Sequence, residues 1–403
     1  MLKPLFVTNT ARCGSGLIAR MLTSGNEANI VAEAHLDLFR SLRNSIVKYA
    51  SEPELTSRPL EQSPFFDYFF SPEHQKIMRC VQACPSIDIP LKENEWERML
   101  IPLVKRAKIE NRDMIPVYSH SKADNYRECF LKQIENIAAA RKLDKTKIKW
   151  VGIKDSWIIE LFLPLARTFP DAKFIVIIRD PRASISSNQL VQNPKMIAHV
   201  LSFAKSWRKH LAFATHYKNH PEIDKRLHIV TFEQFVTHPE EKSRELCDFL
   251  EIEFKPSMLD TDTYIDYSTG TTWRGNSNYE ETTRGISVHR IDRWRKKLPP
   301  EMVRTIELVC APDMKLIGRE PLTQQNQFWP NTEILEFLLS ESLNSKAWRN
   351  DFGRLEMDYG FELVRKSLID SDRKFSDKKL IESAFLFEEV YDALRTPSIQ
   401  PIF

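Results

Sequence analysis

Five consecutive apolar residues, FIVII at positions 174–178, constrain the fold of this chain more than any other feature. They are rich in β-branched side chains, and charged residues bound them at both ends. A run that is apolar on both faces is typical of a strand inside a parallel sheet covered by helices. Asp180-Pro181 ends the run, and a helical pattern begins near Ala183. We therefore predict a central parallel strand that is followed by a helix.

Short apolar runs alternate with helical patterns along much of the chain. Further strands are predicted at residues 5–7, 29–32, 151–153 and 228–230. Apolar residues at helical spacing predict helices from about Ser15, over 157–168, across 197–211 and over 239–250. Strands that alternate with helices are typical of an α/β fold with a parallel sheet.

Two segments depart from this alternation in the chain of 403 residues. Residues 50–149 have a mostly helical pattern that many prolines interrupt. After Leu322 the sequence predicts few strands and becomes acidic. From Asn331 onward it contains ten Lys and Arg and fourteen Asp and Glu, a net charge of −4. Because the whole chain carries +3, the residues before Asn331 carry +7. We predict one α/β domain over 1–322 with a helical insertion at 50–149, and an acidic helical extension over 323–403.

Composition and charge argue against several classes of protein. The net charge of +3 is too small to indicate a nucleic-acid-binding protein, although a basic main body suits an anionic ligand. Six widely spaced cysteines form no CxxC pair, which favours free thiols over a disulfide framework. We find no membrane-length apolar run, signal peptide or cluster of metal ligands in the sequence. We expect a soluble, cytoplasmic protein, and a homo-oligomer is left open.

The loop at 10–16, of sequence TARCGSG, joins the first predicted strand to the first predicted helix. Such a loop presents unpaired N–H groups and the positive end of a helix dipole, so it binds phosphate readily. A nucleoside triphosphate fits poorly, because the Lys and hydroxyl residue of a P-loop are missing after Gly16. A dinucleotide fits better, since Gly14, Gly16 and Ala19 match GxGxx[GA] and Glu33 follows the second strand.

Two observations weaken the dinucleotide interpretation without removing it. Six residues (TNTARC) separate Val7 from Gly14, whereas the fingerprint has its first glycine tight against the strand. Arg12 also supplies a cation that a dinucleotide loop does not need.

Two motifs resemble those of the sulfotransferases that use 3′-phosphoadenylyl sulfate (PAPS). ARCGSG resembles their loop for the 5′-phosphosulfate, in which a Lys or Arg precedes a turn rich in Ser, Thr and Gly. RDPRASISS at 179–187 resembles their 3′-phosphate site, in which an Arg at a strand end is followed eight residues later by a Ser. Arg179 and Ser187 occupy those places, with Ser187 expected two turns into the helix, and together they could hold one phosphate. A surface Arg–Asp pair with a helix cap at Ser184 is the simpler alternative.

The resemblance extends over about residues 1–40 and 150–320, and the motifs favour the carbohydrate and tyrosylprotein branch. It implies a P-loop-like three-layer sandwich, PAPS as sulfate donor, 3′-phosphoadenosine 5′-phosphate as product, and no metal. Phe232 stands where the family has a Tyr near adenine; it could pack on the base but cannot donate a hydroxyl. The residues expected to contact the nucleotide are Arg12, Cys13, Gly14, Ser15, Gly16, Leu17, Arg179, Ser187, Phe232, Arg284 and Gly285.

In-line sulfuryl transfer would require three catalytic roles. Arg12 and the loop N–H groups would stabilise charge on the leaving oxygen. An acceptor hydroxyl also needs a general base. The resemblance points to Glu33, followed by His35 and then His120; an exposed Glu at a helix start and structural histidines are the alternatives. Lys154 lies in a KDP-like segment whose Lys would bind the sulfuryl group, unless it is an ordinary surface lysine.

These expectations describe a PAPS-dependent sulfotransferase that modifies a hydroxyl or amine of a small-molecule acceptor, a natural product or metabolite. A saccharide or a peptide tyrosine is the alternative acceptor. We expect residues 50–149 to cap the acceptor site, and the acidic extension either to line it or to make a subunit contact. An NAD-dependent oxidoreductase, which leaves Arg179 and Ser187 unexplained, and a non-catalytic relative are the alternatives of other classes.

Overall fold

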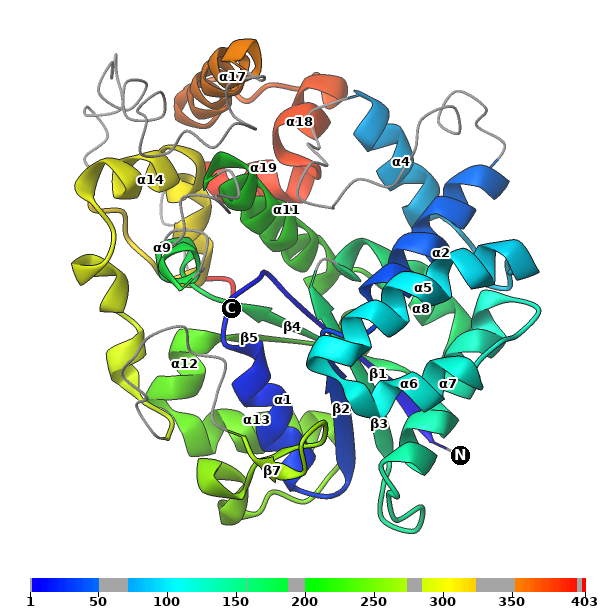
Figure 1. Cartoon of the computed structure of the whole chain (residues 1–403). Coiled ribbons are helices and arrows are strands. Elements are labelled where there is room, and N and C mark those ends of the chain that lie inside the picture. The colour runs from blue at the N-terminus through cyan, green and yellow to red at the C-terminus, as the bar shows by residue number, and fades with distance from the viewer. Residues whose placement is uncertain are drawn as a thin grey trace.

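A five-stranded parallel sheet forms the centre of the computed structural model, which describes residues 2–50, 72–156, 158–187, 200–273, 285–323, 352–396 and 401–403 (Figure 1). The strand order is β2-β3-β1-β4-β5. The bounds are β1 Lys3–Asn9, β2 Ala28–Ala32, β3 Trp150–Ser156, β4 Lys173–Ile178 and β5 Leu227–Thr231. The FIVII run lies in β4, between β1 and β5, while β1 occupies the middle of the sheet.

Helices cover both faces of this sheet. Side chains alternate along each strand, so both faces present apolar side chains for the helices to bury. Leu5 and Val7 of β1 pack into a core with α1 (Ser15–Ser24), α12 (Phe232–Thr237) and α13 (Pro239–Leu250). Phe6, between them, faces the other and larger core. These three layers, with a glycine loop between the middle strand and the first helix, confirm the predicted α/β, P-loop-like sandwich.

The segment predicted as an insertion is mostly helical where the structure describes it, and residues 51–71 lie outside that part. Helix α2 Leu36–Tyr49 ends just before this segment, whose elements are α4 Pro72–Ala83, α5 Glu93–Glu110, η2 Arg112–Met114, α6 Ile115–Ser119 and α7 Tyr126–Ala140. They lie together at the right of Figure 1. Apolar residues from α2 and from α4 to α7 belong to the same core as Phe6.

The connections after β3 and β4 differ in detail from the predictions. The helix expected over 157–168 is a 3-10 turn, η3 Ile158–Leu161, followed by α8 Phe162–Thr168, and Trp157 lies outside the described residues. After β4 come α9 Pro181–Ser186 and α11 Val200–Lys218. A small hairpin, β6 Ile265–Asp266 and β7 Thr271–Thr272, was not predicted. The remaining elements before residue 323 are η5 Asp224–Arg226, η6 Pro256–Leu259, η7 Thr261–Thr263, η8 Val288–Arg290, η9 Arg293–Lys296, α14 Pro300–Met314 and η10 Lys315–Ile317.

The C-terminal segment is helical over its described part, as predicted, with α17 Phe352–Asp370, α18 Lys378–Phe385 and α19 Glu388–Arg395. These helices lie at the top of Figure 1, next to α11 and α14. Two buried ion pairs join α17 to the main body, Arg208 with Glu362 and Arg365 with Asp313 at 2.9 Å. The division of the chain at residue 322 stays a prediction.

Two general properties complete the description. All six cysteines are free thiols. Among the helices of the described ranges, none combines the length and the apolarity that crossing a bilayer demands.

Candidate active site

Three loops meet where β1, β3 and β4 end, because parallel strands place their carboxyl ends at one edge of a sheet. The glycine loop follows β1, the segment 179–187 follows β4, and the turn at 33–35 follows β2 and contacts the end of β3. Most of the residues predicted to form the site lie in or beside these loops.

The glycine loop has a backbone that strongly restricts its sequence. Arg12 and Gly14 both have left-handed conformations, with φ of 65° and 83°. A Cβ atom on Gly14 would lie 2.3 Å from Cδ2 of Phe232, so only glycine fits against that ring. No side chain caps the N-terminus of α1, which leaves its first N–H groups available to an anion.

The predicted loop residues that follow are largely buried. Cys13 and Leu17 turn their side chains into the core, so only their backbone atoms could contact a ligand. Burial raises the pKa of the Cys13 thiol to about 11, while the charges of Lys154 and Arg179 oppose that rise. Both cations therefore lie close to the loop.

Arg12, Arg179 and Ser187 form one contact group beside the glycine loop. Arg12 donates from Nε to the carbonyl oxygen of Ser187 at 2.9 Å. Arg179 donates to the carbonyl oxygen of Arg12 at 3.1 Å and lies 3.5 Å from Oγ of Ser187. Its guanidinium also lies over the ring of Phe232, 4.4 Å from the centroid. Residues that are 175 positions apart in the sequence thus meet around Gly14.

Two details of this group differ from the sequence predictions. Helix α9 has only six residues, so Ser187 follows its last residue instead of lying two turns inside a longer helix. Phe232 is only 2% exposed and packs against both Gly14 and Arg179. This placement suits a support for Arg179, and its contact with adenine stays a prediction.

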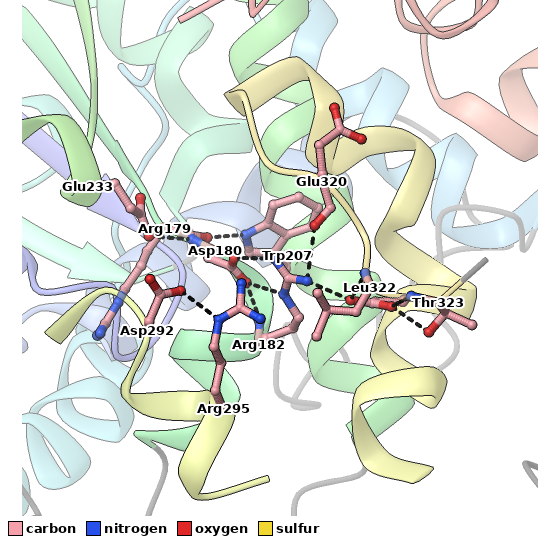
Figure 2. A network of polar contacts seen from close by, with 11 residues as sticks. Arg179, Asp180, Arg182, Trp207, Glu233, Asp292, Arg295, Glu320, Leu322 and Thr323 are labelled. Atoms are coloured by element: carbon pink, nitrogen blue, oxygen red, sulfur yellow. Dashed lines mark hydrogen bonds and ion pairs between the residues drawn. The ribbon is translucent and has the colours of Figure 1, made fainter. Parts of the chain in front are cut away.

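A buried polar network fixes the backbone that carries Arg179 (Figure 2). The indole of Trp207 donates to the carbonyl oxygen of Arg179 at 2.7 Å, and Glu233 accepts from the backbone N–H of Asp180 at 3.0 Å. Asp180 caps α9 and pairs through both oxygens with Arg182, at 3.0 and 2.7 Å. The Arg–Asp pair of this motif is therefore buried, and its arginine is Arg182 instead of Arg179. Asp180 also caps the helix.

Sequence reasoning assigned no role to the partners in this network. Arg182 also pairs with Glu307 on α14 at 2.6 Å, and Glu307 in turn accepts from the N–H groups of Leu322 and Thr323. The RDPR motif contains Arg182, but no sequence pattern singled out Glu307. Burial, together with the charge of Asp180, raises the pKa of Glu233.

Further arginines extend the basic surroundings of Arg179. Arg179 donates to the carbonyl oxygen of Arg290 at 2.7 Å. Burial and the charges of Arg293 and Arg179 lower the pKa of Arg290. Since like charges disfavour one another here, an anion bound among them would be stabilised. Of the other two predicted contacts, Gly285 donates from its backbone N–H to Oγ1 of Thr261 at 3.1 Å, whereas Arg284 lies outside the described residues.

The predicted base and the predicted sulfuryl-binding lysine are in direct contact. Glu33 has a left-handed backbone, with φ of 57°, and its N–H donates to the carbonyl oxygen of Lys154 at 2.8 Å. The ammonium of Lys154 forms an ion pair with the Glu33 carboxylate. Lys154 is only 3% exposed, so it is not the surface lysine of the simpler interpretation.

The two histidines considered as alternative bases have other surroundings. His35 is fully buried, its Nε2 lies 3.0 Å from Oε1 of Gln133, and burial lowers its pKa to about 4. It is therefore neutral at neutral pH and enclosed by protein. His120 is exposed, directly follows α6, and contacts the carbonyl oxygen of Pro116 in that helix. Both rank below Glu33 as bases, and their roles stay untested.

The arrangement offers an anion-binding loop, a second cationic cluster and an acid–base pair at one edge of the sheet. Arginines and helix N–H groups bind phosphate and sulfate oxygens, and a carboxylate accepts a proton. Within the ranges that the structure describes, no group of three His, Cys, Asp or Glu side chains could hold a metal ion.

Comparison with known families identifies one family for this chain. Its model, described as the sulfotransferase family, matches residues 4–256. Protein-tyrosine sulfotransferase 1 of Danio rerio is 28% identical over 178 residues, which cover 42% of this chain and 48% of the relative. Protein-tyrosine sulfotransferase 1 of Mus musculus is 29% identical over 195 residues, which cover 45% and 50%. The chain thus spans about half the length of these curated relatives. A solved sulfotransferase domain from the curacin biosynthetic pathway has 17% identity and a TM-score of 0.43, covering 76% of this chain and 96% of that one.

Proposed function

We propose, on the premise that this chain belongs to the sulfotransferase family, that it transfers a sulfuryl group from PAPS to a hydroxyl or amine of a small molecule, a natural product or metabolite. The observation that carries the proposal is the contact group around Gly14. It joins Arg12, Arg179 and Ser187 beside the uncapped N-terminus of α1. A ligand with two separate phosphate groups accounts for both this cluster and the loop, whereas a dinucleotide accounts only for the loop.

Each group in the donor site has a proposed task. The N–H groups at the start of α1 and the guanidinium of Arg12 bind the 5′-phosphosulfate end. Arg179 and Ser187 bind the 3′-phosphate, and the ring of Phe232 holds the Arg179 guanidinium in place. Two anion sites that flank one loop suit this nucleotide better than a single-phosphate ligand.

The chemistry is an in-line displacement at sulfur. When bound, PAPS supplies the sulfuryl group, and the bond from sulfur to the 5′-phosphate oxygen breaks as the bond to the acceptor forms. Glu33 accepts the proton of the acceptor at a carboxylate oxygen. Lys154, paired with Glu33, stabilises negative charge on the sulfuryl oxygens, and Arg12 stabilises the departing phosphate oxygen.

Contacts on both sides of Glu33 support a small acceptor. Asn111, after α5, donates to the carbonyl oxygen of Ala32 at 3.0 Å, and Tyr118 on α6 donates to that of Ala34 at 2.6 Å. The helical insertion therefore lies beside the base, and we infer that it limits the size of the acceptor, which favours a small molecule over a polypeptide. A peptide tyrosine is the second candidate, because the curated relatives named above are protein-tyrosine sulfotransferases. The cytoplasmic location and the homo-oligomer stay predictions.

Two measurements test this function. We expect labelled PAPS to transfer its sulfate to at least one acceptor in a panel of hydroxyl and amine compounds, saccharides and tyrosine peptides. Calorimetry with 3′-phosphoadenosine 5′-phosphate should show much weaker binding for Arg12→Ala and Arg179→Ala, while the exposed control Arg244→Ala binds normally. Unchanged binding by both site variants, or preference for NADH in a fluorescence titration, would refute the donor site.

A further inference from the structure

The turn that carries Glu33 is tied to neighbouring elements at each of its three residues. Glu33 donates its N–H to the carbonyl oxygen of Lys154, and the carbonyl oxygen of Ala34 accepts from Tyr118. The N–H of His35 donates to Oδ2 of Asp155 at 2.7 Å. A non-glycine residue with positive φ is strained, so Glu33 keeps this conformation only because these contacts hold the backbone in place.

Asp155 is the one acidic side chain among these ties, and its surroundings are unfavourable to a carboxylate. It directly follows Lys154 on β3, and its side chain points to the opposite face of the sheet. It is fully buried, and Oδ1 has no hydrogen-bond partner among the described residues. A buried polar atom without a partner costs stability, so packing alone gives no reason for an aspartate here.

We propose that Asp155 is a positioning residue for sulfuryl transfer: its side chain holds the His35 N–H, and through it the turn that keeps Glu33 against Lys154. The inference rests on the proposed function, because it takes Glu33 as the base. It does not place Asp155 in contact with substrate. It explains why two consecutive residues of β3 bind the two ends of one turn.

The charges around Asp155 support the neutral form. Burial first, and then the charge of Glu33, hold the pKa of Asp155 well above its usual range. Lys154 and Arg106 on α5 oppose this shift, as does the His35 N–H. Tyr118 on α6 also lies near, and its own pKa rises through burial and the charge of Asp155. Ionisation of Asp155 at high pH would place a second negative charge beside Glu33 and compete for Lys154.

Two substitutions separate this role from a simple packing role. Asp155→Asn keeps an oxygen for the His35 N–H and cannot ionise, so kcat near neutral pH should remain close to wild type. The pH dependence of kcat that comes from Asp155 should disappear in this variant. Asp155→Ala removes the tie, and displacement of the base should lower kcat on the order of 100-fold while the affinity for 3′-phosphoadenosine 5′-phosphate stays unchanged. Tyr118→Phe, which removes a neighbouring hydrogen bond, should lower kcat without removing that pH dependence.

Activity-independent readouts keep the inference distinct from the proposed function. In a crystal structure of Asp155→Ala, Glu33 should leave its left-handed conformation or separate from Lys154. Since the pKa of Asp155 is raised in the folded state, its stabilising effect is full below its unfolded pKa and is lost as pH rises. The melting temperature of Asp155→Asn should therefore rise relative to that of the wild type as pH increases above about 4.

An unchanged turn in the Asp155→Ala structure would overturn the inference, as would full turnover by that variant or a constant difference in melting temperature across pH. If Asp155→Ala does not fold, the pH series of Asp155→Asn alone decides. Failure of the wild type to transfer sulfate, with the turn and melting behaviour as expected, would instead refute the proposed function.

Discussion

Replacing Gly14 with alanine tests the packing on which the donor site depends. Gly14 has φ of 83°, and its new Cβ would lie 2.3 Å from Cδ2 and 2.4 Å from Cε2 of Phe232. The left-handed backbone costs a non-glycine residue about 1 kcal/mol. Forcing the ring aside adds about 1–3 kcal/mol, as overpacking does in other cores. We therefore expect Gly14→Ala to lower the free energy of unfolding by about 2–4 kcal/mol.

A matched control and a double mutant separate these two costs. Gly270 also has positive φ, 69°, but a Cβ there would meet nothing within 4 Å. Gly270→Ala should therefore cost only about 1 kcal/mol. Phe232→Ala alone should cost about 3–5 kcal/mol through the cavity it leaves. The double variant of Gly14 and Phe232 should cost about 1–3 kcal/mol less than the sum of the singles, because the clash is absent.

Urea unfolding of the four proteins and the wild type measures these values, and calorimetry with 3′-phosphoadenosine 5′-phosphate measures the functional effect. Because Phe232 supports Arg179, a displaced ring should weaken nucleotide binding in Gly14→Ala but not in Gly270→Ala. Equal losses at Gly14 and Gly270, or additive single variants, would refute the close contact between Gly14 and Phe232.

Three further predictions follow from burial and charge. Burial lowers the pKa of His35 to about 4 and of His210 to about 3, from 6.5, so the unfolded chain binds more protons in this window. As pH is lowered from about 6.5, the free energy of unfolding should therefore decrease by up to about 1.4 kcal/mol per pH unit for each histidine. A pH series of urea titrations measures this decrease, which should be less steep in His210→Gln. Arg208→Met leaves Glu362 buried without its guanidinium and should cost about 3–5 kcal/mol, which thermal unfolding would detect and Glu362→Leu in the same chain should largely restore. Glu33→Gln should lower kcat by roughly 10²–10⁴-fold with unchanged nucleotide affinity, and near-normal turnover would show that another group is the base.

Much of the secondary structure could be predicted because periodicity is a local property. The helix predicted from Ser15 begins at that residue, and the one predicted over 239–250 has those bounds. The hairpin 265–272 was missed, since each of its strands has only two residues and carries no alternating pattern. A helix was predicted near Ala183, but the early end of α9 was not, so Ser187 was expected inside a helix that ends before it.

Part of the candidate site could be predicted because its motifs lie at strand ends. Arg12, Arg179 and Ser187 were each chosen from spacing and resemblance, and they lie in contact. The support beneath them was not predictable. Glu307, which pairs with Arg182 across 125 positions, stands in a helix whose sequence resembles any half-buried helix.

The sequence by itself determined which segments become strands and helices, and which loop and strand ends carry phosphate-binding residues. This information is local, because a repeat of two or 3.6 residues records which faces are buried. Only the tertiary structure decided that β1 lies in the middle of the sheet, that Phe232 packs on Gly14, and that Glu33 meets Lys154 across 121 positions. Those contacts depend on which strands pair and in what register. The type of a side chain does not indicate a contact partner that is so distant in the chain.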